Sequence, residues 1–160
     1  KGVIKKGENF LKIHSSAGFL EGEYRMWPPM LIGDFAVKKK GEEYCLIPLS
    51  DRIKTGSWGE QGLPFFAGEV IYLQDMRLPE NMAGPPLLLD LGKVANLCKV
   101  EVNGELVGEK IAPPWQFELR EFVKNRNIEL KVRVTNTAHN LFCRDPKPAG
   151  LLGPVSICYI

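Results

Sequence analysis

The sequence predicts an all-β sandwich, and three observations indicate it. Apolar residues recur at every second position over much of the chain, turn-forming residues punctuate these runs, and stretches with helical periodicity are scarce. The 16 Gly and 12 Pro supply the many turns that an all-β domain requires. The 160 residues fit one domain with its own core, and 44% hydrophobic with 25% charged residues is typical of a globular chain.

The clearest strand is expected over 128–134, where Ile128, Leu130, Val132 and Val134 alternate with charged residues. This alternation places one face in a core and the other in water. Three consecutive leucines at 87–89 predict a central strand covered on both faces. About eight or more strands are expected in total, at 31–37, 44–49, 69–78, 87–91, 98–102, 115–119, 128–134 and 155–160.

Turn signals connect these strands. Asn103-Gly104 suits a type I′ hairpin, because both residues tolerate positive φ. The basic run Lys38–Lys40 precedes Gly41 and is expected at a solvated hairpin tip. A single helical turn is expected, over Arg120–Lys124.

We expect residues 1–29 to form an N-terminal linker and residues 30–160 to form the sandwich. Two stretches lack regular alternation, Ser50–Gly68 and Asn136–Pro154, and are expected to be long loops. Ligand contacts on a sandwich usually reside in such loops.

Composition argues against two classes of partner. A net charge of +2, with no cluster of basic and aromatic residues, argues against a nucleic-acid surface. No apolar run approaches the roughly 20 residues needed to cross a bilayer, so no membrane span is expected. The sequence shows no signal peptide. Because the chain begins at Lys1 rather than Met, we expect it to have been processed or excised.

The four cysteines, Cys45, Cys98, Cys143 and Cys158, are far apart and never form a C-x-x-C pair. This spacing argues against a zinc site. Cys45, Cys98 and Cys158 each lie among alternating apolar residues, so buried free thiols are expected there rather than disulfides. Buried free thiols favour a reducing, cytoplasmic compartment, although a parent protein could be secreted.

Three blocks of sequence carry a family resemblance. The first is GSWGEQGLPFFAG at 56–68, which fits the pattern W-x-x-x-G-x-P-x-[YF]-[SA]-G. The second combines LDLGKV, VEVNGELVG and PPWQFEL between 89 and 119, and the third combines LKVRVTNT with GLLGPV between 130 and 155. Their order resembles the galactose-binding-like, jelly-roll "sugar-binding" domains of family 2-type and rhamnosidase-like glycoside hydrolases. Asn125-Arg126-Asn127 replaces a turn that usually contains glycine, and the loop at 144–148 varies in the family.

The sequence offers no catalytic constellation of its own. Glycoside hydrolysis uses two carboxylates flanking the scissile bond, whereas most acidic residues here fall on outward strand positions. Asp90 lies between leucines on a covered strand and is expected to be a hydrogen-bonded structural acid. No G-x-S-x-G, phosphate loop or metal loop is present, so no catalytic residue, metal ligand or cofactor is assigned, and structural calcium is not indicated. The resemblance implies that the catalytic acid and base belong to a separate barrel domain.

Sugar binding has support from the two loops. A pyranose stacks a C–H face on an aromatic ring and offers hydroxyls to polar side chains. The candidate carbohydrate-binding residues are Trp58, Gln61, His139, Asn140 and Arg144. In the alternative interpretation, Trp58, Phe65 and Phe66 plug the sandwich or dock against a neighbouring domain, while Trp115 belongs to the core.

The resulting hypothesis is a non-catalytic sandwich domain of a multidomain glycoside hydrolase. It would pack on the catalytic domain of the same polypeptide and contribute to carbohydrate binding. Two alternatives stay open: an autonomous carbohydrate-binding module, and a protein-interaction sandwich without sugar affinity.

Overall fold

A computed structural model of the chain describes residues 5–12, 14, 30–80, 87–143 and 145–159. The chain divides into two compact units, Lys1–Gly33 and Asp34–Ile160, and every strand described lies in the second. Most of residues 1–29 lie outside the described ranges. The expected division into a linker of 1–29 and a sandwich of 30–160 therefore stays a prediction.

The regular secondary structure described in the second unit is almost entirely β, which confirms the predicted fold class. Every pairing between its named strands is antiparallel, as expected for a sandwich. The elements are β1 Ala36–Lys40, β2 Glu43–Ile47, β3 Glu69–Arg77, β4 Leu87–Asp90, β5 Lys93–Val94, β6 Leu97–Val102, β7 Glu105–Lys110, β8 Gln116–Glu118, β9 Asn127–Thr135, α1 His139–Phe142, β10 Leu151–Gly153 and β11 Ser156–Tyr159.

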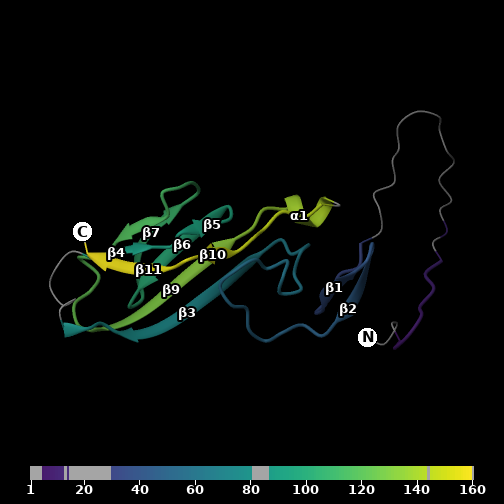
Figure 1. The fold of residues 1–160 in the computed structure, drawn as a ribbon, viewed down its shortest axis with the longest axis horizontal. Helices are drawn as coiled ribbons and strands as arrows, with labels where there is room; N and C mark the ends of the chain where they lie inside the picture. Colours follow the sequence, from purple (N-terminus) through teal and green to yellow (C-terminus); the bar gives the residue numbers. More distant parts are fainter. Residues whose placement is uncertain (1–4, 13, 15–29, 81–86, 144, 160) are drawn as a thin grey trace. The chain divides into compact units, whose positions relative to one another are not determined.

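Two sheets supply the layers of the sandwich. One has the strand order β3-β9-β6-β7 and the other has the order β11-β4-β8. In Figure 1, β3 and β9 are the long strands of the first sheet. A single buried cluster contains Val132 and Val100 from the first sheet together with Leu89 and Phe117 from the second. The two inner faces therefore share one core, in which each fully buried aliphatic side chain contributes about 1.5–3 kcal/mol.

The registers place the alternating residues of neighbouring strands on the same side. Val132 of β9 lies opposite Tyr72 of β3 and Val100 of β6, and all three face the core. The intervening residues form the outer face. There Glu101 contacts Lys131 at 3.1 Å and Arg133 at 3.2 Å. The hydrogen bond from Lys131, followed by the nearby positive charges, lowers the pKa of Glu101.

The hairpin β1-β2 corrects one expected boundary. The strand begins at Ala36 rather than Leu31, because the chain bends at Gly33-Asp34. Lys38 to Lys40 lie on β1 and are exposed, and they lead into a turn at Gly41. Gly41 has φ +63°, a conformation that glycine adopts without strain.

The structure confirms some of the other local predictions and refines others. The Asn103-Gly104 turn is confirmed, with φ +51° and +80° between β6 and β7. The predicted central position of the strand is also confirmed, since β4 lies between β11 and β8. Its coverage on both faces is only partial, because Leu88 is half-buried. At the single turn expected over Arg120–Lys124, the amides of Phe122 and Val123 both donate to the Leu119 carbonyl, so one turn forms there without continuing into a helix. The four-residue α1 lies in the second loop, where no helix was expected.

The cysteines are free, as expected, but not all are buried. Cys98 is buried in β6, and its burial raises the pKa of the thiol to about 11. Cys45 and Cys158 are exposed, which contradicts the prediction. The reason is their position: Cys45 lies on the largely exposed strand β2, and Cys158 lies on β11, at the edge of its sheet.

Candidate functional site

The two long loops lie against each other. The amide of Gly56 donates to the Leu151 carbonyl at 2.7 Å, and the amide of Trp58 donates to the Ala149 carbonyl at 2.8 Å. Residues 56–68 and 136–151 are called the loop junction below. Four of the five candidate sugar-binding residues lie in its described part, so the structure brings together segments that are distant in sequence.

Trp58 lies at the centre of the loop junction. Its side chain is fully buried, and its indole Nε1 donates a hydrogen bond of 2.7 Å to the Tyr72 hydroxyl. The Phe66 ring packs edge-on against the indole, with centroids 5.5 Å apart. A Cβ at Gly150 would lie 2.6 Å from Nε1, so only glycine lets the second loop approach this closely.

Asn136 fixes the end of β9 against the first loop. It is buried, its Nδ2 donates to the Phe66 carbonyl at 2.9 Å, and its amide donates to the Gly68 carbonyl. Its Oδ1 accepts a hydrogen bond of 2.6 Å from Asn96. Asn136 was expected to bond to nearby backbone, and its bonds in fact extend to Phe66, Gly68 and Asn96.

Gln61 braces the first loop from within. Its Oε1 accepts from the amide of Lys54 at 2.8 Å, and its Nε2 donates to the Lys54 carbonyl at 3.0 Å. A longer bond of 3.3 Å reaches the Ser57 carbonyl. The carboxamide is therefore engaged with backbone on both of its ends.

Asn140 braces the second loop in the same way. It is 3% exposed, its Nδ2 donates to the Lys147 carbonyl at 2.8 Å, and its Oδ1 accepts from the Lys147 amide at 3.0 Å. His139 is exposed, and its Nδ1 lies 3.6 Å from the Cys143 sulfur. Arg144 lies outside the described residues.

These contacts divide the candidate residues by role. Trp58 presents no free face to a sugar, and Gln61 and Asn140 bond to backbone. The geometry therefore favours the interpretation of Trp58 as a plug of the sandwich. Among the candidates that the structure describes, His139 is the one whose side chain lies exposed to solvent. The sequence patterns did not single out Tyr72 as a site residue, because it alternates like any core residue of its strand.

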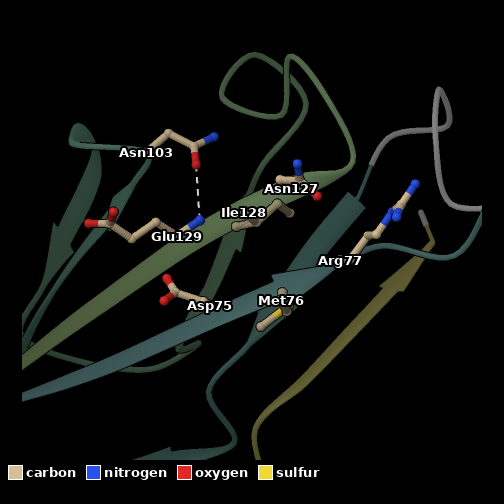
Figure 2. Close-up of a pocket in the computed structure, with 7 residues that line it drawn as sticks. All are labelled: Asp75, Met76, Arg77, Asn103, Asn127, Ile128 and Glu129. Atoms are coloured by element: carbon tan, nitrogen blue, oxygen red, sulfur yellow. Dashed lines mark hydrogen bonds between the residues drawn. The ribbon is translucent and has the colours of Figure 1, made fainter.

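A separate open hollow lies at the end of β3 and the start of β9 (Figure 2). It has a volume of about 430 Å³, and Asn103 Oδ1 accepts from the Glu129 amide at 2.9 Å beside it. Asp75 and Glu129 are direct cross-strand neighbours, and both are exposed. A glycosidase instead keeps one carboxyl protonated in an apolar pocket beside an ionised partner. The side chains of Asp75 and Glu129 both lie in solvent rather than in an apolar pocket.

Asp90 has the structural role expected of it, although it is half-buried rather than buried. Its Oδ2 accepts from Gln116 Nε2 at 2.8 Å, and its Oδ1 accepts from the Gly92 amide at 2.7 Å. These two bonds lower the pKa of Asp90, with the Gln116 bond the larger cause. The carboxylate thus stays ionised and holds the turn between β4 and β5.

Within the described ranges, no three His, Cys, Asp or Glu side chains gather closely enough to hold a metal ion. The same part of the chain contains no helix of the length and apolarity that a bilayer span requires.

Comparison with known proteins shows a similarity in sequence to part of a longer protein. No protein-family model matches the chain. Over 124 residues the chain is 31% identical to a protein of Formosa agariphila named "Putative beta-glucuronidase". The match covers 75% of this chain but 11% of that protein.

Two solved structures are similar in fold. A rhamnosidase from Novosphingobium sp. PP1Y superposes with a TM-score of 0.54 at 24% identity, over 77% of this chain and 14% of the rhamnosidase. The β-glucuronidase 2 of Bacteroides uniformis, solved with a covalently bound cyclophellitol-type aziridine, gives a TM-score of 0.52 at 16% identity, over 70% and 14% of the two chains. The chain is therefore similar, over most of its length, to a β-sandwich region that occupies a small part of large glycoside hydrolases.

Proposed function

We propose that the chain is a non-catalytic, galactose-binding-like jelly-roll domain of a multidomain glycoside hydrolase, and that it packs on the catalytic domain of the same polypeptide. The observation that carries this proposal is that the match covers most of this chain but only a small part of the relative. Three quarters of the chain match a relative of which they make up only 11%, so most of that relative lies outside the match. The motif at 56–68 supports the jelly-roll assignment, because its Trp58 and glycines join the loops of the sandwich.

The internal contacts support a scaffold role. The side chain of Trp58 bonds to Tyr72, and those of Gln61 and Asn140 bond to backbone, which rigidifies the end of the sandwich. A rigid end suits a domain that packs on a neighbour and shapes the rim of its substrate groove. Within the proposal, direct sugar contact falls to His139, while Trp58, Gln61 and Asn140 position the loops.

Two assays test the missing catalytic function and the packing. The 160-residue chain is incubated with aryl β-glucuronide, β-galactoside and α-rhamnoside, and no cleavage is expected once circular dichroism has confirmed a β-rich fold. Cleavage that persists through further purification steps would contradict the proposal. Deleting residues 34–160 from the polypeptide that carries them should lower the thermal stability of the remainder. An unchanged melting temperature would count against packing on a catalytic domain.

A glycan array followed by calorimetric titration distinguishes the scaffold from an autonomous module. The scaffold is expected to bind no glycan tightly in isolation, because the described part of the loop junction keeps its tryptophan buried. Micromolar binding that is lost in His139→Ala but kept in Arg77→Ala would favour the binding module instead. Arg77 is a suitable control because it is exposed and lies on β3, outside the loop junction.

A further inference from the structure

Helix α1 brings a thiol and an imidazole together. The sulfur of Cys143 lies 3.6 Å from His139 Nδ1, within the range of a sulfur hydrogen bond. The imidazole is exposed and the thiol is half-buried, so small molecules in solvent reach the pair. Neither side chain takes part in the hydrogen bonds that join the two long loops.

The surrounding backbone holds the pair in place. The Cys143 amide donates to the His139 carbonyl at 3.0 Å, which sets the two side chains one helical turn apart on the same side. The His139 amide in turn donates to Thr137 Oγ1 at 3.4 Å. Asn140, between the two residues, is anchored by both of its bonds to Lys147. The imidazole and the thiol are thus positioned before any reagent arrives.

The other three thiols have different surroundings. Cys98 is buried in the core, and Cys158 directs its thiol toward the Leu88 carbonyl at 3.8 Å. Cys45 is exposed on β2 and lies opposite Lys38. Cys143 is the one cysteine for which the described structure shows an imidazole contact. Cys45 and Cys158 can therefore serve as reference thiols against which the reactivity of Cys143 is compared.

We propose that Cys143 and His139 form a nucleophilic pair that reacts with low-molecular-weight disulfides and yields a mixed disulfide at Cys143. His139 Nδ1 accepts the thiol proton as the sulfur attacks one sulfur of the disulfide. A new S–S bond forms, the original S–S bond breaks, and the departing thiolate takes the proton from the imidazolium. Cys143 is oxidised, half of the small disulfide is reduced to a thiol, and no further reagent is needed. This modification site shares His139 with the proposed sugar contact, but the inference does not rest on that function.

The test measures disulfide exchange residue by residue in the intact 160-residue chain. The protein is mixed with oxidised glutathione, quenched with acid at set times, digested and mapped by mass spectrometry. Cys143 is expected to react about tenfold faster than Cys45 or Cys158, which is a modest gain for an adjacent general base. Equal rates at Cys143 and Cys45 would overturn the proposal.

A matched variant isolates the imidazole. In His139→Gln the side chain keeps a polar acceptor but cannot take up a proton, so the Cys143 rate should fall about tenfold, to that of Cys45. His14→Gln removes the other histidine and should leave the Cys143 rate unchanged. An unaltered urea midpoint shows that His139→Gln retains the fold. Retention of the fast rate in the folded His139→Gln variant would overturn the proposal.

A neutral reagent separates proton transfer from charge attraction. Oxidised glutathione is anionic, and the basic Lys147 lies in the same loop. Bis(2-hydroxyethyl) disulfide carries no charge, so the rate advantage of Cys143 over Cys45 should persist with it. If Cys143 and Cys45 react with the neutral disulfide at equal rates, the faster reaction of Cys143 with oxidised glutathione is due to charge attraction. That result would overturn the proposed role of the imidazole.

Discussion

The indole nitrogen of Trp58 and the hydroxyl of Tyr72 are joined by a hydrogen bond of 2.7 Å that links the first long loop to strand β3. The same hydroxyl accepts a weaker bond of 3.4 Å from the amide of Leu151, at the end of the second long loop. One phenolic oxygen therefore ties together three segments of the sandwich. Trp58, which the sequence suggested as a sugar-binding residue, therefore has a structural role.

Removing that oxygen should destabilise the domain. In Tyr72→Phe the buried indole N–H loses its acceptor, which costs about 1–3 kcal/mol of unfolding free energy. Urea denaturation followed by tryptophan fluorescence measures the loss. Tyr159→Phe is the control, because Tyr159 is exposed on β11 and its loss of a hydroxyl should change the midpoint little. Equal midpoints for Tyr72→Phe and wild type would show that the bond carries no net stability.

The close approach at Gly150 makes a second prediction. Gly150→Ala adds a Cβ 2.6 Å from the indole nitrogen at a φ of +115°, whereas Gly104→Ala at φ +80° meets nothing within 4 Å. Both variants carry backbone strain, which for Gly104 is about 1 kcal/mol. Overpacking at Gly150 should add about 1–3 kcal/mol. Chemical denaturation of the two variants in parallel gives the difference, and indistinguishable losses would contradict a steric limit at Trp58.

The third prediction concerns Asn140. Asn140→Ala removes both bonds to the Lys147 backbone in a buried setting and should cost about 1–3 kcal/mol, or open the second loop locally. Hydrogen exchange at the Lys147 amide reports the local opening directly. Asn125→Ala, which removes an exposed bond to Asn127, serves as the matched control and should leave that amide protected.

The fourth prediction is a pH dependence at Asp90. Its pKa is lowered in the folded state by the Gln116 and Gly92 bonds, from an ordinary value of 3.8. A carboxyl with a depressed folded pKa contributes stability that is fully present above about pH 4 and is lost as the pH falls through the folded value. Wild type should therefore exceed Asp90→Ala in stability at neutral pH, and the gap should narrow below pH 4. A gap that is constant down to pH 2 would exclude ionisation of Asp90 as its source.

The fold was largely predictable because side-chain alternation follows directly from strand geometry. Val132 and its neighbours on β9 are buried at every second position, as the sequence pattern requires. The pattern did not reveal whether a strand would be covered. Cys45 alternates with apolar residues, yet β2 belongs to an exposed hairpin. The short strands β5 and β10 are too brief to produce a periodic signal.

The candidate site was less predictable, because the sequence does not specify which group a polar side chain will hydrogen-bond to. The carboxamides of Gln61 and Asn140 suit sugar hydroxyls and backbone groups equally well. In the folded chain both carboxamides hydrogen-bond to backbone groups. The geometry of a turn such as Asn103-Gly104 depends on two adjacent residues, whereas the environment of Trp58 depends on segments that meet only after folding. Local sequence therefore identified the loops but not the use made of their side chains.

The bonds between the loops also carry a kinetic consequence. The bond between Leu151 and Tyr72 joins residues 79 positions apart, and that between Asn136 and Phe66 spans 70 positions. Closing such long segments costs chain entropy before any contact compensates for it. We therefore expect the end of the sandwich that holds Trp58 to assemble after the local β6-β7 hairpin.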